Sequence, residues 1–179
     1  MLGAFNCNGL TSIVVEQGNQ VYDSRDNCNA IIETATNTLF EGFSVTVIPN
    51  SVTAIGSSAF REVWDLHEIT IPESVAAIGE HAFIHTYLEK VTSERPEPVE
   101  IPDNAFSDNC YEQATLYVPQ SSIEAYSTTG GWKNFKSILA IVEGGTAEPY
   151  AVLSEDSLTV TFYYDDQKAA REGIDINNK

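Results

Sequence analysis

A short apolar motif recurs along this chain at a fixed interval. The segment Val52–Phe60 is repeated as Val75–Phe83 and, in shortened form, as Ile101–Phe106. The isoleucine, alanine and phenylalanine positions of these segments each step by 23 residues. A period between about 20 and 50 residues is typical of a solenoid, in which each repeat buries its apolar side only by stacking on its neighbours. The spacing therefore predicts a stack of coils.

Each regular unit contains two apolar runs. The first runs are rich in alternating β-branched residues, which favour strands, and each ends in a proline, which cannot donate to a strand ladder. The second runs are shorter, end at a glycine, and precede an Ala-Phe pair expected in one helical turn. The fold class expected is therefore mainly β with short helical turns, arranged as a solenoid of 23-residue units. The first runs are Val45–Pro49, Glu68–Pro72 and Thr115–Pro119, and the second are Val52–Ile55 and Val75–Ile78.

Two glycines in the repeat allow a sharper prediction. Gly56 and Gly79 occupy the position at which the third unit has Pro102. Proline cannot adopt a positive φ, so we expect negative φ at both glycines. Glycine would then serve the close approach of two chain segments rather than a left-handed backbone.

The N-terminal part departs from the regular period. An enlarged unit is expected at 16–44, where Ala30–Thr34 and Thr38–Glu41 predict a β-hairpin and Val21–Tyr22 a further short strand. The chain begins within a repeat, and a solenoid that starts there exposes an apolar edge. We therefore expect Phe5 and Leu10 to be accessible.

The C-terminal part is expected to hold a cap, a linker and the start of a further module. The segment 107–142 predicts a C-terminal cap, with a short helix at Ser121–Tyr126 that a serine caps, followed by bulky residues at helix-like intervals from Trp132 to Leu139. The glycine-containing stretch 143–149 predicts a linker. Residues 150–179 predict a β-hairpin and a short helix at Asp166–Glu172, which makes them the start of another module.

Composition excludes several classes of partner. The net charge of −17 creates a negative field that repels phosphate backbones and anionic lipids, so neither nucleic acid nor a membrane surface is expected as a partner. No apolar run approaches the roughly 18 residues of a membrane span, and the first residues lack a signal-peptide pattern. The protein is thus either cytoplasmic or exported by a signal outside this chain. Three cysteines, Cys7, Cys28 and Cys110, are consistent with buried thiols or with one disulfide.

The sequence contains no recognisable catalytic or metal-binding pattern. His81 and His85 flank a core pair without a zinc-site motif, and His67 is isolated. The oxygen-rich segment Asp23–Asn29 lacks calcium-loop spacing and contains Arg25, so a polar turn is favoured over a Ca²⁺ site. We expect no enzyme activity, no metal and no cofactor.

The repeated motif resembles the BspA-type leucine-rich repeat, a 23-residue class found in surface proteins of bacteria and some protists. An Ile-Pro strand, a Ser-Val-x-x-Ile-Gly segment and an Ala-Phe pair recur in register over residues 3–106, and 91–142 is similar to the family's terminal cap. The resemblance implies a leucine-rich-repeat solenoid in a secreted or surface-anchored, non-enzymatic protein. It also implies binding of host or bacterial partners, with adhesion to extracellular matrix the activity most often attributed to the family.

Strand alternation separates a structural ladder from a candidate binding face. Phe60, Phe83 and Phe106 are expected to stack in the core. The residues between the inward-facing positions should lie in adjoining rows on the outer sheet face, with the tyrosine as the main anchor. An ordinary solvated sheet face is the alternative. The predicted binding face consists of Glu68, Thr70, Lys90, Thr92, Thr115 and Tyr117.

Three functions fit these features. The first is a cell-surface module that binds a host or neighbouring-cell protein through the strand face. The second is a glycan-binding module, for which Tyr117, Trp64 and a few other tyrosines are the available aromatic residues. The third is a structural spacer that presents another domain.

Overall fold

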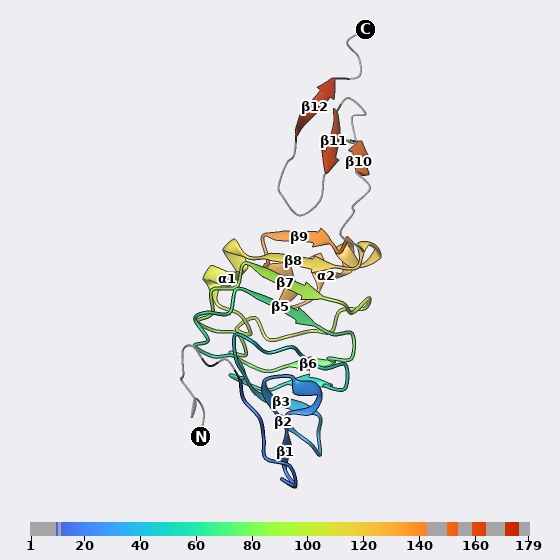
Figure 1. Cartoon of the computed structure of the whole chain (residues 1–179). Helices are drawn as coiled ribbons and strands as arrows, with labels where there is room; N and C mark the ends of the chain where they lie inside the picture. Colours follow the sequence, from blue (N-terminus) through green and yellow to red (C-terminus); the bar gives the residue numbers. More distant parts are fainter. Residues whose placement is uncertain (1–9, 11, 143–149, 154–158, 164–170, 176–179) are drawn as a thin grey trace. The chain divides into compact units, whose positions relative to one another are not determined.

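The computed structural model describes residues 10, 12–142, 150–153, 159–163 and 171–175. The chain divides into two compact units, Met1–Ile141 and Val142–Lys179, which are described separately (Figure 1). Most regular elements of the first unit are short strands. Its strands are β1 Tyr22–Asp23, β2 Ala30–Glu33, β3 Thr38–Gly42, β4 Ala54–Ile55, β5 Glu68–Ile71, β6 Ala77–Ile78, β7 Lys90–Ser93, β8 Thr115–Val118 and β9 Ser137–Ala140. Its helices are η1 Arg25–Asn27, α1 Asp108–Gln113, η2 Gln120–Ser122, α2 Ile123–Thr128 and η3 Trp132–Asn134.

One parallel sheet, in the order β5-β7-β8-β9, is formed by the first runs of successive units (Figure 1). β5, β7 and β8 alternate between buried and solvent-facing residues, as the β-branched pattern predicts. The strands expected at Glu68–Ile71 and Thr115–Val118 are confirmed. The helix-like intervals from Trp132 to Leu139 are a wrong prediction, because Ser137–Ala140 forms strand β9, which pairs in parallel with β8.

A second sheet has the order β1-β2-β3-β4-β6 and contains the second runs. β2 and β3 form the predicted hairpin, and β1 pairs antiparallel with β2. β3 then continues in parallel with β4, and β4 with β6. The hairpin is thereby joined to the repeats through Leu39, which pairs with Ile55.

The phenylalanine column forms a stacked ladder in the core. The ring centroids of Phe60 and Phe83 are 5.0 Å apart, those of Phe83 and Phe106 are 4.7 Å apart, and both pairs are nearly coplanar. All three rings are buried, together with Ile55 and Ile78. The predicted ladder is confirmed. The Ala-Phe pairs lie in successive hydrogen-bonded turns rather than in a regular helix.

The two repeat glycines behave as predicted. Neither Gly56 nor Gly79 has a positive φ. A Cβ atom on Gly79 would lie 2.7 Å from the Cα atom of Ser57 in the preceding coil. The glycine is therefore needed for the close approach of two coils. Left-handed backbone instead occurs at Ser58 and His81, two residues after each glycine, and again four residues later at Glu62 and His85.

One expected strand is absent from both sheets. Val45–Ile48 alternates between exposed and buried residues, but it forms no strand and has no hydrogen bond to β5. The Val47 N–H instead donates to the Cys28 carbonyl oxygen at 3.0 Å, and the Thr46 hydroxyl donates to the Asn29 carbonyl oxygen at 2.7 Å. The enlarged unit therefore holds this segment away from the sheet.

Two short helices flank β8. α1 is capped by Ser107, whose side chain accepts a hydrogen bond from the Cys110 N–H. The helix expected at Ser121–Tyr126 is present as η2 and α2, with Ser122 at the N-cap position of α2. The hydroxyl group of Ser122 donates to the Pro96 carbonyl oxygen at 2.6 Å and makes no capping bond.

The described residues of the second unit form a small antiparallel sheet. Its strands are β10 Tyr150–Leu153, β11 Thr159–Tyr163 and β12 Arg171–Asp175, in that order. The helix predicted at Asp166–Glu172 is wrong at its last two residues, which begin β12; residues 164–170 lie outside the described part. The predicted linker 143–149 and Phe5 also lie outside it, and Leu10 is half-buried.

Candidate binding surface

The sheet places all six residues of the predicted binding face in two adjoining rows. Parallel pairing aligns Glu68 with Lys90 and Lys90 with Thr115. The second row is Thr70, Thr92 and Tyr117, aligned by the same ladders. Glu68 and Thr70 are exposed, and the other four residues are half-buried. The geometry therefore brings these side chains together on the solvent face.

Lys90 and Tyr117 interact on this face. The Lys90 Nζ atom lies 5.2 Å from the centroid of the Tyr117 ring. A cation at this distance over an aromatic ring is attracted by the ring quadrupole. The contact orders both side chains and leaves Tyr117 partly accessible to a partner.

The face extends beyond the predicted residues. β9 adds Ser137 beside Thr115 and Leu139 beside Tyr117. The Leu139 side chain is 44% exposed, which places an apolar residue at the end of the second row. Sequence reasoning missed it because this stretch was expected to be helical.

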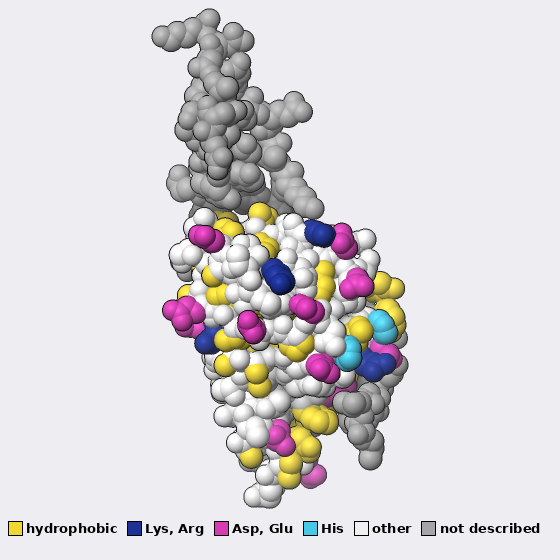
Figure 2. Space-filling model, turned by 180° about the vertical axis from the view of Figure 1, so that it is seen from behind, with side chains coloured by type: hydrophobic (Ala, Val, Ile, Leu, Met, Phe, Trp, Pro, Cys, Tyr) yellow, Lys and Arg dark blue, Asp and Glu magenta, His cyan; other side chains and the backbone are white. Residues whose placement is uncertain are grey.

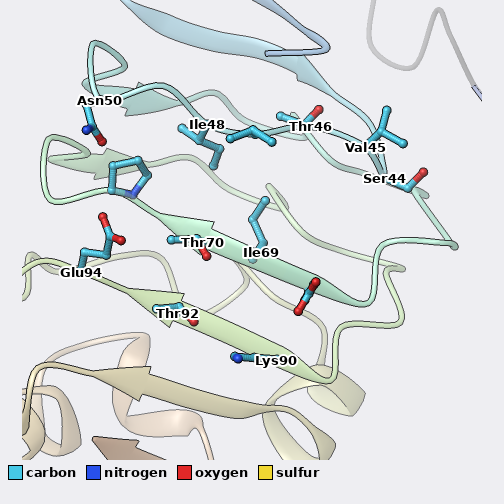
Figure 3. Close-up of a pocket in the computed structure, with 13 residues that line it drawn as sticks. Ser44, Val45, Thr46, Ile48, Asn50, Ile69, Thr70, Lys90, Thr92 and Glu94 are labelled. Atoms are coloured by element: carbon cyan, nitrogen blue, oxygen red, sulfur yellow. The ribbon is translucent and has the colours of Figure 1, made fainter. Parts of the chain in front are cut away.

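A groove lies beside β5, where the chain approaches the sheet without joining it. Its volume is about 520 Å³ (Figure 3). Figure 3 shows that the segment 44–50 comes near the end of β5 at Asn50 and diverges from β5 towards Ser44. Glu68, Thr70, Lys90 and Thr92 line the groove as well as the sheet face. The groove is therefore continuous with the predicted binding face.

Two acidic residues, Glu68 and Glu94, and one basic residue, Lys90, line the groove. Neither Glu68 nor Glu94, which both line the groove, forms an ion pair with a described residue. On the opposite face, Figure 2 shows acidic side chains spread over the surface with few basic ones between them. A partner rich in basic residues is favoured over an acidic one.

An exposed aromatic cluster lies in the turns that precede β5 and β7. The Trp64 and His85 rings stack at an interplanar angle of 3°, with centroids 5.7 Å apart. The Tyr87 ring centroid lies 5.5 Å from that of Trp64. Trp64 and Tyr87 are 38% and 55% exposed. These three residues are called the aromatic cluster below.

The oxygen-rich segment near the N-terminal hairpin is a polar turn held by an ion pair. The Arg25 guanidinium bonds both carboxylate oxygens of Asp23, at 2.7 and 2.6 Å, and the Thr34 hydroxyl donates to the same carboxylate. These bonds to Arg25 lower the pKa of Asp23 to about 2. Both oxygens of the Asp23 carboxylate therefore already accept hydrogen bonds from neighbouring side chains. The part of the chain that the structure describes contains no group of three or more potential metal ligands.

Cys28 and Cys110 are buried free thiols, and Cys7 lies outside the described residues. Burial raises the pKa of both thiols, that of Cys110 to about 12. A thiol with such a pKa is not a nucleophile at neutral pH. Both residues fill core space.

Among the described residues, no helix has the length and apolar character needed to cross a membrane. A search of curated proteins finds no match. A crystal structure described as a leucine rich cell surface protein from Faecalibacterium prausnitzii A2-165 is similar, with a TM-score of 0.48 and 22% sequence identity. The match covers 79% of this chain and 45% of that one, so this chain spans less than half of that protein.

The repeats themselves identify the family. The profile described as "BspA type Leucine rich repeat region (6 copies)" matches residues 34–138, which include the hairpin strand β3, the phenylalanine ladder and the parallel sheet up to β9. This is more than half of the chain. The protein therefore belongs to the BspA-type leucine-rich repeat family.

Proposed function

We propose that this protein is a non-enzymatic, cell-surface interaction module that binds a protein of a host or a neighbouring cell through the face of the β5-β7-β8-β9 sheet. The observation that carries the proposal is the alignment of six polar and aromatic side chains in two rows, bordered by the exposed Leu139. A sheet face with a tyrosine beside an apolar residue has the composition of a protein interface. Extracellular matrix is the partner class that the family resemblance suggests.

This function requires a stable and exported scaffold. We propose that the repeats form a solenoid that the segment 107–142 closes as a C-terminal cap, and that 143–149 links it to a further module at 150–179. The buried rings of Trp132 and Phe135, which contact Phe106, support the capping role. The same resemblance supports the proposal of an extracellular or cell-surface location and of a bacterial protein.

Binding to immobilised matrix proteins tests the proposal. Tyr117→Ala removes the anchor of the face and is expected to weaken binding by roughly tenfold or more, as for residues at the centre of an interface. Tyr87→Ala is the matched control, because Tyr87 is an exposed tyrosine of the aromatic cluster. Biolayer interferometry at physiological salt measures both. Equal binding by wild type and Tyr117→Ala would contradict the proposal.

A glycan-binding function is the second candidate, and the aromatic cluster is the observation that favours it. Sugar rings stack on exposed aromatic faces, and Trp64 with Tyr87 offers two such rings within 5.5 Å. Saturable binding on a glycan array that is lost with Trp64→Ala and kept with Tyr117→Ala would favour this candidate. If neither matrix proteins nor glycans bind, the spacer function is favoured instead.

A further inference from the structure

Among the described residues, strand β5 has a hydrogen-bonded neighbour strand on one edge only. The carbonyl oxygens of His67 and Ile71 accept bonds from the Lys90 and Glu94 N–H groups, on the side of β7, at 3.1 and 3.0 Å. In a parallel strand, both polar groups of one residue point to the same side, and alternate residues point to opposite sides. The N–H and C=O groups of Thr70 therefore point into the groove. They have no hydrogen-bond partner among the described residues.

The walls of the groove suit an extended chain. Val45 and Val47 are 38% and 72% exposed and line the wall of the groove that faces β5. Ile48 and Ile69 are buried residues that also line it. The volume of about 520 Å³ falls within the roughly 300–1,000 Å³ of ordinary ligand sites. A strand that entered here would gain backbone hydrogen bonds and apolar contacts together.

One end of the groove is acidic. A second hollow of about 420 Å³ is lined by Asn50, Glu73, Ser74 and Glu94, of which Asn50 and Glu94 also line the groove. Figure 3 shows Asn50 and Glu94 at the same end of the groove. The Ser74 hydroxyl oxygen is buried there without a hydrogen-bond partner in the described part of the chain. The Arg95 guanidinium donates to the Glu73 carbonyl oxygen at 2.7 Å, but neither the Glu73 nor the Glu94 carboxylate forms an ion pair with a described residue. A further basic side chain at this end would therefore meet two carboxylates.

We propose that this groove binds an extended segment of a partner protein by strand addition to β5, with a basic residue of that segment placed between Glu73 and Glu94. Strand addition gains affinity from main-chain hydrogen bonds and specificity from alternate side chains. A second copy of this chain is a poorer occupant, because two molecules with a net charge of −17 repel each other. The inference rests on the proposed protein-binding function and specifies how one partner segment is held.

The probe is a labelled synthetic peptide of alternating threonine and valine with two lysines at one end, titrated by fluorescence anisotropy. Two further peptides separate the sources of affinity. One is methylated on alternate backbone nitrogens, which removes strand pairing and keeps the charge. The other ends in glutamates. We expect the unmodified lysine peptide to bind saturably and each altered peptide to lose about tenfold or more in affinity, which corresponds to about 1.4 kcal/mol.

The matched protein variants are Thr70→Pro and Thr70→Val. Proline at 70 removes the N–H that points into the groove and leaves the bonds to β7 intact, a position at which edge strands tolerate proline. Valine keeps the N–H group and the β-branched shape. Because the two variants differ in the backbone N–H, we expect Thr70→Pro to bind the peptide about tenfold or more weakly than Thr70→Val, with circular dichroism reporting whether each variant is folded.

Several results would overturn the inference. Absence of binding by the lysine peptide would exclude this partner chemistry. Equal affinity of the methylated and unmodified peptides would mean that charge attraction, and not strand pairing, holds the peptide. The same comparison tests strand pairing if Thr70→Pro does not fold. If Tyr117→Ala weakens binding of a matrix protein while Thr70→Pro does not, the sheet face is the site and the groove is not. If neither variant changes matrix binding, the proposed function fails as well.

Discussion

The coil that contains Leu39 and Ile48 meets the next coil in two different ways. On one side β3 and β4 pair in parallel, and the Gly42 and Gly56 N–H groups donate to the Ala59 and Leu39 carbonyl oxygens, both at 2.8 Å. On the other side no hydrogen bond joins 44–50 to β5. The same pair of coils is thus joined by a strand ladder along one flank. Along the other, the Ser44 hydroxyl donates to the Asp65 carboxylate before β5 at 2.9 Å, and the edge of β5 itself stays open.

The two coils differ in the length of chain between the core turn and the segment that precedes the proline. Gly42 and Phe60 are equivalent positions, because their N–H groups donate to the Ala59 and Ala82 carbonyl oxygens of the next coil. Ile69 follows Phe60 by nine residues and Thr46 follows Gly42 by four, although Ile69 and Thr46 each lie three residues before a proline. Because this connection is shorter, the segment Val45–Ile48 begins closer to the core turn. The Cys28 and Asn29 carbonyl oxygens of the enlarged unit then accept hydrogen bonds from this segment. A solenoid repeat can therefore keep its core position and lose its place in the sheet.

Substitution of a phenylalanine of the core ladder, which supports both flanks, should have the largest effect on stability. Phe83→Ala deletes a fully buried ring between Phe60 and Phe106, and its cost is expected to be about 3–5 kcal/mol of the free energy of unfolding. Trp64→Ala, an exposed aromatic substitution, should cost below about 1 kcal/mol. Urea denaturation measures both, and equal losses would contradict the assignment of the ladder to the core.

An added methyl group at Gly79, where the coils of β4 and β6 approach each other closely, should have the next largest effect on stability. An alanine Cβ at Gly79 would collide with the Ser57 backbone, so Gly79→Ala is expected to cost about 1–3 kcal/mol. Gly130→Ala is the control, because its nearest neighbour would be the Glu100 side chain at 3.8 Å. Thermal unfolding compares the two variants. A neutral Gly79→Ala would mean that the coils are not in close contact here.

The open flank depends on the bonds that draw Thr46 towards the enlarged unit. Thr46→Val removes the hydroxyl that donates to the Asn29 carbonyl oxygen and accepts from the Phe43 N–H at 2.8 Å. Because the residue is buried, we expect a loss of about 1–2 kcal/mol in the free energy of unfolding. Thr92→Val, for which no side-chain bond exists in the described part, should be nearly neutral. A neutral Thr46→Val would show that other contacts hold the segment.

The polar turn of the enlarged unit should make the smallest contribution. The pKa of Asp23 is about 2 in the folded protein against an ordinary value of 3.8, so its stabilising effect is present above pH 3.8 and is lost as the pH falls towards 2. The Asp23–Arg25 pair is partly exposed, so Asp23→Asn should cost below about 1 kcal/mol at neutral pH. The unfolding free energies of the two proteins should differ at pH 7 and converge as the pH falls to about 2 and below. A constant difference would contradict the role of the pair.

Most of the fold could be predicted from the positions that repeat every 23 residues. The spacing of Ile55, Phe60 and their equivalents predicted the ladder, and Pro102 predicted the φ of the glycines. The groove could not be predicted from the same periodicity, because Val45–Ile48 has the sequence pattern of a strand. Only its contacts with the enlarged unit keep this segment out of the sheet. β9 was missed since short apolar runs fit a helix and a strand alike. The candidate face was predictable because alternation depends on local sequence, whereas Leu139 depended on β9.

Amide hydrogen exchange at Thr70 and Thr92 tests the open flank most directly. The two threonines occupy aligned positions on neighbouring strands, but the Thr92 N–H lies within the β5-β7 ladder and the Thr70 N–H points into the groove. Exchange measured by NMR in the native protein should be fast at Thr70 and slowed by orders of magnitude at Thr92, because ladder amides exchange only when the structure opens. Equal protection at both residues would show that β5 is paired on both edges and would contradict the comparison of the two flanks.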